Sequence, residues 1–365
     1  MTPPAYRLRL PGPTTVPERV RQAIARPALN HRGPEFTAIM RRAEELLKPI
    51  LDTRNPIMFL ACSGTGVMEA SLVNVLAPGE RVLMCVNGQF GERYAAIGKA
   101  LGVAVDTLDV PWGEAIDPAD IERRVEANDY RAVVVVHNES STGVVADLAP
   151  IGGILRDRST VLVVDSVSGL GGIEMRQDDW GVDVLVSASQ KALMCPPGIG
   201  IASVSSKAWQ IVNRETSMPR FYWDFRRAMK DGEALETPFT PSASLIVGLR
   251  EALEMIHEEG LPQVYERHRR LSTQLRDGCA RLGLSSFARV HSLSSTVVAL
   301  NVPQHLKGGD IVRSLYKRHG TVIAGSRNEL SGKVIRIGTM GCIQESDILT
   351  DLEHLELVLK ELNGR

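Results

Sequence analysis

Two observations predict an α/β protein with a mostly parallel sheet. Short β-branched apolar runs alternate with amphipathic helical stretches from about residue 35 to residue 205. Most of these runs are apolar at consecutive positions, which is typical of strands that helices cover on both faces. With 365 residues, 44% of them hydrophobic and 23% charged, the chain can bury a large core. Its length suggests about two domains.

The elements of the first part follow in order. Apolar residues at helical spacing, beginning with Phe36, Ile39 and Met40, predict a helix over residues 36–51. Apolar runs between polar or glycine residues predict strands at residues 57–61, 81–85, 103–109, 131–137, 161–165 and 183–187. Helices are predicted between them at residues 66–76, 91–101 and 118–126.

The pattern changes after residue 206. Aromatic, charged and proline residues at 214–229 and 236–241 predict a loop that crosses the surface, and a long amphipathic helix over 244–258 is expected to link two domains. The remaining chain predicts helices at 264–282, 310–319 and 345–362 and strands at 295–302 and 334–337. We therefore expect a large domain of residues 1–245 and a small α+β domain of residues 246–365.

Composition excludes several classes of protein. The 42 Lys and Arg residues nearly balance the 43 Asp and Glu residues, so neither nucleic acid nor an anionic membrane is an expected partner. The apolar runs are too short to span a bilayer, and the N-terminus does not read as a signal peptide. Five cysteines without a C-x-x-C spacing predict neither a disulfide framework nor a metal site, and favour a reducing, cytoplasmic compartment.

A lysine and an aspartate follow two of the predicted strands. Asp165 ends the strand at 161–165, and Lys191 lies just beyond the strand at 183–187. The carboxyl ends of such strands form the ligand-binding edge of an α/β sheet. A desolvated lysine is a nucleophilic amine, and a Lys–Asp pair suits pyridoxal phosphate, with Lys on the aldehyde and Asp beside the ring nitrogen. Taken singly, a lysine that reaches solvent and an aspartate that caps a turn are ordinary alternatives.

A turn of small residues precedes the helix predicted at 66–76. Ser63-Gly64-Thr65-Gly66 would direct backbone N–H groups and the helix dipole at an anion such as a phosphate. A dinucleotide fingerprint fails here because Glu69 occupies the position of its third glycine. An NAD-dependent oxidoreductase is therefore disfavoured.

Motifs along nearly the whole chain resemble the class V aminotransferases, in the branch of the serine–glyoxylate and alanine–glyoxylate enzymes. They are Pro11-Gly12-Pro13, Ser63-Gly64-Thr65-Gly66, His137-Asn138-Glu139-Ser140-Ser141-Thr142-Gly143, Val164-Asp165-Ser166-Val167-Ser168, Ser189-Gln190-Lys191-Ala192, Phe239-Thr240-Pro241-Ser242 and Gly332-Lys333-Val334-Ile335-Arg336-Ile337-Gly338.

This resemblance implies the type I fold of pyridoxal-phosphate-dependent transferases and a homodimer with its active site at the subunit interface. It implies that Lys191 forms a Schiff base with pyridoxal 5'-phosphate, that Asp165 pairs with the pyridinium, and that Arg336 clamps the substrate carboxylate. The N-terminal segment should reach the active site. The remaining cofactor-binding roles that it implies fall on Ser63, Gly64, Thr65 and Gln190 near the phosphate, Thr240 from the second subunit, Ser140 near the ring and Phe90 stacked on it.

The implied activity is a ping-pong amino transfer from a small amino acid, with serine or alanine first, to a 2-oxo acid such as glyoxylate or pyruvate. Phe90, Thr65 and Thr237 stand where the alanine–glyoxylate type has Trp, His and Tyr, so the donor stays open. Ureidoglycine, 2-aminoethylphosphonate and pyridoxamine are alternative donors. A lyase or desulfurase of the same fold would need a reactive cysteine on a mobile loop, which neither Cys62 nor Cys195 resembles.

Overall fold

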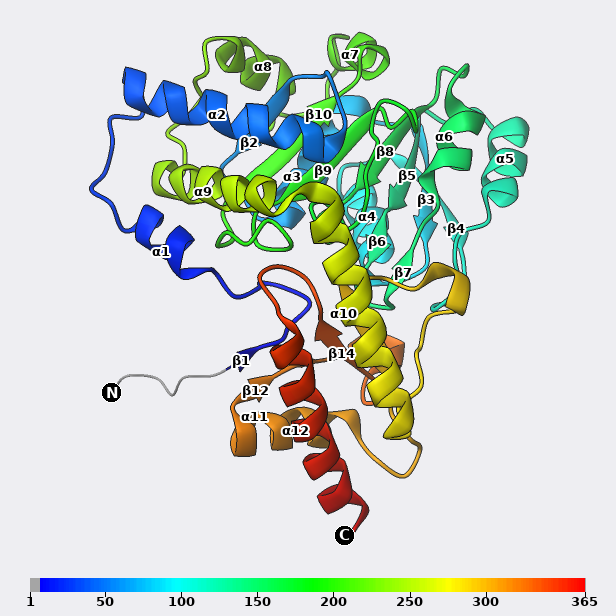
Figure 1. Ribbon diagram of the computed structural model, residues 1–365. Helices are drawn as coiled ribbons and strands as arrows, with labels where there is room; N and C mark the ends of the chain where they lie inside the picture. The colour runs from blue at the N-terminus through cyan, green and yellow to red at the C-terminus, as the bar shows by residue number, and fades with distance from the viewer. Residues whose placement is uncertain (1–6, 365) are drawn as a thin grey trace.

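A seven-stranded sheet forms the centre of the larger part of the molecule (Figure 1). The computed structural model describes residues 7–364. The strands lie in the order β2 (Ile57–Leu60), β10 (Gly200–Val204), β9 (Val184–Ala188), β8 (Val161–Asp165), β5 (Ala132–Val136), β3 (Arg81–Val86) and β4 (Ala104–Asp109). All neighbours pair in parallel except those of β10, which is antiparallel to both β2 and β9. The predicted α/β class is confirmed.

Helices cover both faces of this sheet. One face packs against α2 (Pro34–Leu51), α5 (Pro118–Ala127), α6 (Leu148–Leu155) and α9 (Ala243–Glu259), with α1 (Glu18–Ile24) beside α9. The other packs against α3 (Gly64–Val75), α4 (Gln89–Ala100), α7 (Ser206–Val212) and α8 (Phe225–Glu233). Within β5, Val133 and Val135 enter the first core while Val134 and Val136 enter the second. This two-sided burial explains why β5, with the sequence Ala-Val-Val-Val-Val, is apolar at every position, whereas the edge strand β4 is partly exposed and includes Asp106 and Thr107.

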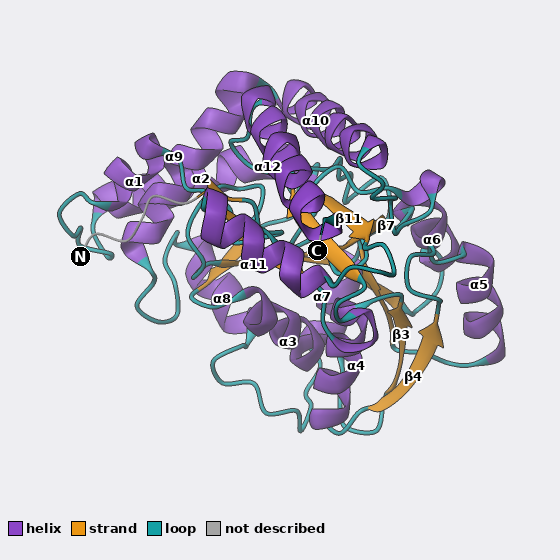
Figure 2. Cartoon of the chain, turned by 90° about the horizontal axis from the view of Figure 1, so that it is seen from below, coloured by secondary structure: helices purple, strands orange, loops and turns teal. Residues whose placement is uncertain are grey.

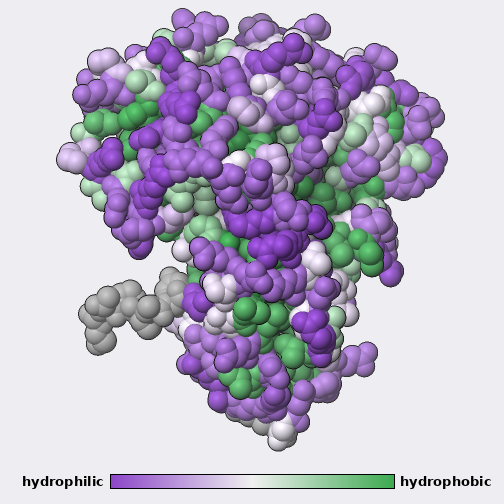
Figure 3. Space-filling model, in the orientation of Figure 1, coloured by the Kyte–Doolittle hydropathy of each residue, from purple (hydrophilic) through white to green (hydrophobic). Residues whose placement is uncertain are grey.

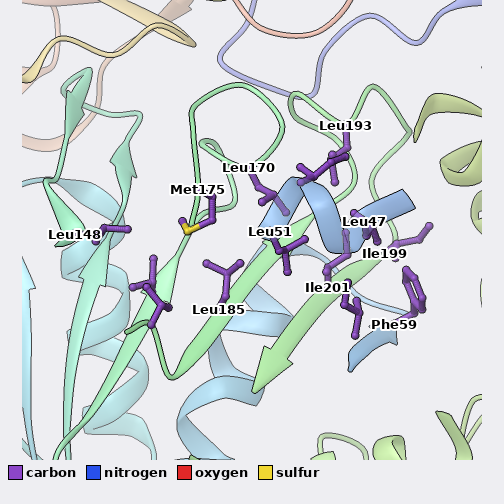
Figure 4. Packing of buried hydrophobic residues seen from close by; sticks show 14 of the residues in the cluster. Leu47, Leu51, Phe59, Leu148, Leu170, Met175, Leu185, Leu193, Ile199 and Ile201 are labelled. Carbon is purple, nitrogen blue, oxygen red and sulfur yellow. The ribbon is translucent and has the colours of Figure 1, made fainter. Parts of the chain in front are cut away.

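Figure 4 shows the first of these cores. Leu47 and Leu51 of α2 lie among Phe59, Leu185 and Ile201 of the sheet. The helix presents its apolar positions three and four residues apart, which is the spacing that predicted it.

The smaller part is built on the antiparallel sheet β11 (Val297–Asn301), β14 (Val334–Gly338) and β13 (Ala324–Gly325). Its core also includes α10 (Leu261–Arg281), α11 (Gly308–His319) and α12 (Glu345–Asn363). Helix α10 runs from the larger part into the smaller one, and Figure 2 shows α10 and α12 together from below. Two further pairs of short strands are β1 (Arg7–Leu8) with β12 (Thr321–Val322) and β6 (Asn138–Glu139) with β7 (Val144–Val145).

Several elements of the described chain were not predicted from the sequence, among them the helices α1, α6, α7 and α8 and the strand β10, whereas α9 matches the helix predicted over 244–258. Strand β10 has a glycine, an alanine and a serine among its five residues, so its strand signal is weak. Helix α8 lies in the predicted surface loop. Asp224 caps it, and only Phe225 and Ala228 of its nine residues are buried, so its apolar pattern is too sparse to predict a helix. Side chains of α9 pack into the core of the larger part, and the domain boundary after residue 245 stays a prediction.

The face visible in Figure 3 is mostly hydrophilic.

Candidate active site

Asp165 and Lys191 lie at the same edge of the sheet. Strands β8 and β9 are parallel neighbours, with Asp165 paired to Val186, and Lys191 follows β9 in a tight turn. Asp165 is 3% exposed and its Oδ1 accepts a hydrogen bond of 2.8 Å from the N–H of Val167. Lys191 is 8% exposed and its Nζ donates a hydrogen bond of 2.5 Å to the carbonyl oxygen of Pro11. The pairing expected from the strand ends is therefore present.

Burial shifts both ionisable groups toward their neutral forms. It lowers the pKa of Lys191 to about 8. The positive charges of Arg336 and Arg93 add to this lowering, and the negative charge of Asp165 opposes it. Burial raises the pKa of Asp165 to about 7. The negative charge of Glu139 adds to this rise, whereas the hydrogen bond from the Val167 N–H and the positive charge of Lys191 oppose it. About one-tenth of the lysine is therefore a free amine at pH 7, far more than for a lysine of ordinary pKa, and this amine can act as a nucleophile.

The predicted anion site is the N-terminus of α3. Ser63 is the N-cap, and its Oγ accepts a hydrogen bond of 3.3 Å from the N–H of Gly66. The N–H groups of Gly64 and Thr65 belong to the first turn, where no intrahelical acceptor exists, so they are available to an anion. A Cβ on Gly64 would lie 3.3 Å from Val167, so this turn adjoins the segment that follows Asp165.

Phe90 is held by a residue that sequence reasoning missed. Glu139 is fully buried, and its Oε2 accepts from the N–H groups of Phe90 at 2.8 Å and Gly91 at 3.2 Å. Its Oε1 accepts from the N–H and Oγ of Ser141 at 3.0 and 2.6 Å. Burial raises the pKa of Glu139, and these four hydrogen bonds oppose that shift. The only sequence signal was the position of Glu139 in the motif that begins at His137.

Arg93 is a second residue that sequence reasoning missed. Its guanidinium lies 4.7 Å from the centre of the Phe90 ring, and its Nη1 donates a hydrogen bond of 3.0 Å to Oγ1 of Thr65. Arg93 therefore links the residue expected to stack on the cofactor ring with the residue expected at the phosphate. Its position one turn into α4 gave no such indication from the sequence alone.

Arg336 approaches the same edge from the smaller part. From β14, its Nη1 donates to the carbonyl oxygen of Ser140 at 3.0 Å and its Nη2 to that of Gly325 at 2.9 Å. Its Nε is buried without a hydrogen-bond partner among the described residues. Burial lowers the pKa of Arg336. The structure thus brings Ser140 and Arg336 together, and Arg336 within electrostatic reach of Lys191.

Gln190 and Thr240 are placed differently. Gln190 precedes Lys191, and its carbonyl oxygen accepts from the N–H of Thr14 at 3.0 Å, which ties the N-terminal segment to the site. Thr240 is exposed and lines a hollow that also includes Ala61, Tyr222 and Phe239. Within residues 7–364 of one chain, Thr240 makes no hydrogen bond to Lys191, Asp165 or Arg336. Its action from a second subunit stays a prediction.

Residues 7–364 contain no group of three or more His, Cys, Asp or Glu side chains that could hold a metal ion. Over the same residues, none of the helices is both long enough and apolar enough to cross a membrane.

Comparison with known proteins places the chain in a family. The model of the family described as aminotransferase class V matches residues 14–345. The soluble hydrogenase small subunit of Synechococcus sp. is 37% identical, over 97% of this chain and 93% of the relative. The serine–glyoxylate aminotransferase of Arabidopsis thaliana is 34% identical, over 99% of this chain and 92% of the relative.

A solved structure agrees with these matches. The alanine–glyoxylate aminotransferase of Nostoc sp. superposes with a TM-score of 0.95 at 32% identity, covering 98% of this chain and 96% of that one. The fold is therefore that of the pyridoxal-phosphate-dependent aminotransferases, as the motifs implied. The chain belongs to the class V aminotransferase family and is a transaminase.

Proposed function

We propose that this transaminase binds pyridoxal 5'-phosphate and moves an amino group from a small amino acid, with serine or alanine first, to glyoxylate or pyruvate by a ping-pong mechanism. One observation carries the proposal. The buried amine of Lys191 and the buried carboxylate of Asp165 lie at adjacent strand ends, beside the N-terminus of α3.

The residues of the site fit the cofactor. Oδ2 of Asp165 makes no hydrogen bond to another described residue and suits a protonated ring nitrogen, while the free N–H groups of Gly64 and Thr65 suit a phosphate. Phe90 offers an aromatic face whose orientation Glu139 fixes through the backbone. When bound, pyridoxal phosphate supplies an aldehyde that reacts with amines and a ring that withdraws electrons from the bonds at the substrate Cα.

Lys191, Asp165 and Arg336 each have a separate role in the reaction. Lys191 supplies the nucleophilic amine and, once released, carries the proton that leaves the substrate Cα, because burial keeps a fraction of its Nζ neutral. Asp165 keeps a proton on the ring nitrogen by placing a negative charge beside it. Arg336 binds the substrate carboxylate through the N–H groups that Ser140 and Gly325 do not occupy, and so fixes the substrate orientation.

The alternatives differ in their support. Ureidoglycine, 2-aminoethylphosphonate and pyridoxamine remain alternative donors, because the guanidinium fork of Arg336 suits both carboxylate and phosphonate oxygens and excludes none of them. A desulfurase would need a reactive thiolate. Burial raises the pKa of both Cys62 and Cys195 to about 12, so neither thiol ionises appreciably near neutral pH.

We also propose a homodimer and a cytoplasmic location. Phe221 and Tyr222 are 72% and 41% exposed, and Tyr222 stacks on Phe239 with ring centres 4.9 Å apart, next to Thr240. Exposed aromatic surface of this kind supports a subunit interface beside the residue expected to act in the partner's site. All five cysteines are free thiols, which supports a reducing compartment.

Absorbance spectroscopy tests the central proposal. Protein saturated with pyridoxal phosphate should show a visible band, which serine or alanine should convert to the spectrum of the amine form and glyoxylate or pyruvate should restore. Borohydride reduction followed by peptide mass spectrometry should find the cofactor on Lys191, and Lys191→Ala should abolish both results. An unmodified Lys191 in saturated, reduced wild-type protein would refute the proposal.

A further inference from the structure

Arg93 of α4 contacts both ends of the expected cofactor site. Its guanidinium lies over the ring of Phe90, 4.7 Å from the ring centre. Its Nη1 donates a hydrogen bond of 3.0 Å to Oγ1 of Thr65, the second residue of α3. The same guanidinium lies within electrostatic range of Asp165 and Lys191, because its charge lowers the pKa of both. A single side chain therefore connects the ring that should stack on the cofactor with the turn that should bind its phosphate.

The Arg93 guanidinium forms no ion pair with any residue of the described range 7–364, although two carboxylates belong to the adjoining elements. Glu139 accepts its four hydrogen bonds from Ser141 and from the backbone of α4 instead. Glu69, one turn beyond Thr65 on α3, forms no ion pair with it either. The Arg93 side chain is half-buried, so its charge is only partly solvated and gains from an anion placed beside it. An anion at the N-terminus of α3 would supply that counter-charge.

The hydroxyl of Thr65 is prepared for such an anion. A hydroxyl has one O–H donor and two lone pairs, and Arg93 occupies a lone pair, so the proton is left for another acceptor. Within residues 7–364, no group accepts a hydrogen bond from Oγ1 of Thr65. The N–H of Thr65 is also free, because it lies in the first turn of α3. A phosphate can accept from both donors, and the positive charge of Arg93 strengthens the O–H as a donor.

We propose that Arg93 is a positioning residue that makes the site selective for the phosphorylated form of the cofactor, acting through the hydroxyl of Thr65. The favoured ligand class is a pyridoxal or pyridoxamine that carries the phosphate, over the same molecules without it. This inference rests on the proposed function, since it assigns the N-terminus of α3 to the phosphate. Free pyridoxamine would leave Arg93 without an anion, so the proposal disfavours it among the alternative amino donors.

Spectroscopic titration of cofactor-free protein tests this selectivity without turnover. Pyridoxal 5'-phosphate and pyridoxal differ only in the phosphate, so the ratio of their dissociation constants measures what the phosphate contributes. Arg93→Met removes the charge and the donors while keeping an unbranched side chain, and should reduce this ratio about tenfold, the effect of one charge-assisted contact. If Arg93 only supported the ring of Phe90, both affinities would fall by the same factor. An unchanged ratio therefore overturns the inference.

Arg93→Lys keeps a positive charge but loses the planar fork, so it should reduce the ratio by less than Arg93→Met does. If the methionine variant does not fold, the lysine variant decides, because a ratio equal to that of wild type again overturns the inference. Arg81→Met is the matched control. Arg81 lies over the ring of Tyr130, 5.3 Å from its centre, at the start of β3 and so at the opposite edge of the sheet. Its removal should leave the ratio unchanged.

A double-mutant cycle tests whether Arg93 acts through Thr65. Thr65→Val keeps the shape of threonine and removes the hydroxyl, so it should also reduce the ratio. Because the two residues act as one unit, the double variant with Arg93→Met should lose little more selectivity than the more affected single variant. Losses that multiply in the double variant would overturn the inference.

The wild-type titration separates this inference from the proposed function. If wild-type protein develops no visible band with pyridoxal 5'-phosphate, the proposed function is wrong. If the band forms and the Arg93 variants keep the wild-type ratio, only the role of Arg93 is wrong.

Discussion

The carbonyl oxygen of Pro11 accepts a hydrogen bond of 2.5 Å from Nζ of Lys191, so the N-terminal segment passes directly over the reactive amine. The next residue, Gly12, has φ +111°, and a Cβ there would lie 2.3 Å from Cδ and 2.5 Å from Nζ of Lys191. A glycine is therefore required both for the backbone conformation and for the space beside the lysine.

We expect Gly12→Ala to displace the Lys191 side chain and raise the dissociation constant for pyridoxal phosphate about tenfold or more. Gly79→Ala is the control, because Gly79 has φ +81° and nothing lies within 4 Å of its added Cβ. Both variants should lose about 1 kcal/mol of stability through backbone strain. Spectroscopic titration with the cofactor should find only the Gly12 variant weakened, and equal affinities would contradict this account.

The pH dependence of cofactor capture should follow the Lys191 amine. With a pKa of about 8, the fraction of neutral amine rises as pH increases, so the rate at which the visible band appears should rise through that region. Burial is the main cause of the lowered pKa and the charge of Arg336 is the next. Arg336→Met should therefore move the midpoint toward higher pH, while Arg313→Met should not. A midpoint that stays in place or moves lower would show that Arg336 does not act on the lysine.

Asp165 should make the cofactor-free protein less stable as pH rises. Its pKa is 3.8 in the unfolded chain and about 7 in the fold, so between these values the folded state binds more protons. The contribution of Asp165 to the free energy of unfolding is therefore fully present below about pH 4. It falls as pH rises to about 7, by an amount on the order of 4 kcal/mol. Asp165→Asn removes this loss. Urea unfolding at pH 5 and pH 8 should find the variant's advantage larger at pH 8, and an equal advantage would argue against the shift.

Sequence patterns were sufficient to predict that Asp165 and Lys191 lie at the same edge of the sheet. Asp165 and Lys191 each follow a strongly apolar strand, and parallel strands place their carboxyl ends at one edge. The contacts that hold the pair depend on longer-range packing. Gly12 reaches Lys191 from a segment whose β1 pairs with β12, more than 300 residues later. No local periodicity encodes such a contact.

The role of Glu139 could not be predicted from the sequence, for a different reason. Its carboxylate accepts hydrogen bonds from three backbone N–H groups. Every residue except proline carries this donor, so the identities of the donor residues do not reveal the contact. A carboxylate in a motif otherwise composed of small polar residues was the available sign, and only the fold shows that it supports Phe90. Strand β10 was missed for a related reason, since its first residue, Gly200, leaves room for Cys62 and Val67, which a Cβ there would approach to 2.5 and 3.0 Å.

A graded series of substitutions tests this role of Glu139. Ser141→Ala removes one of its four hydrogen bonds and should cost about 1 kcal/mol. Glu139→Gln keeps the shape but turns an amide NH₂ toward a backbone N–H, which should cost about 3 kcal/mol and weaken cofactor binding through Phe90. Denaturant unfolding and cofactor titration measure the two effects. If Glu139→Gln matched wild type in both, the carboxylate would have no supporting role.

Thr240 should act in the site of the partner subunit rather than in its own. Thr240→Glu would place a carboxylate against the phosphate of whichever site the residue faces, and should abolish cofactor retention. Mixing this variant with Lys191→Ala distinguishes the two arrangements. If Thr240 acts across the interface, the hybrid dimer contains one site with an intact Lys191 and an intact Thr240, so activity reappears on mixing. If it acts within its own chain, every site in the hybrid is damaged and the mixture stays inactive. Recovery of about a quarter of wild-type activity is expected from statistical exchange of equal amounts, since half of the dimers are then hybrids with one working site each.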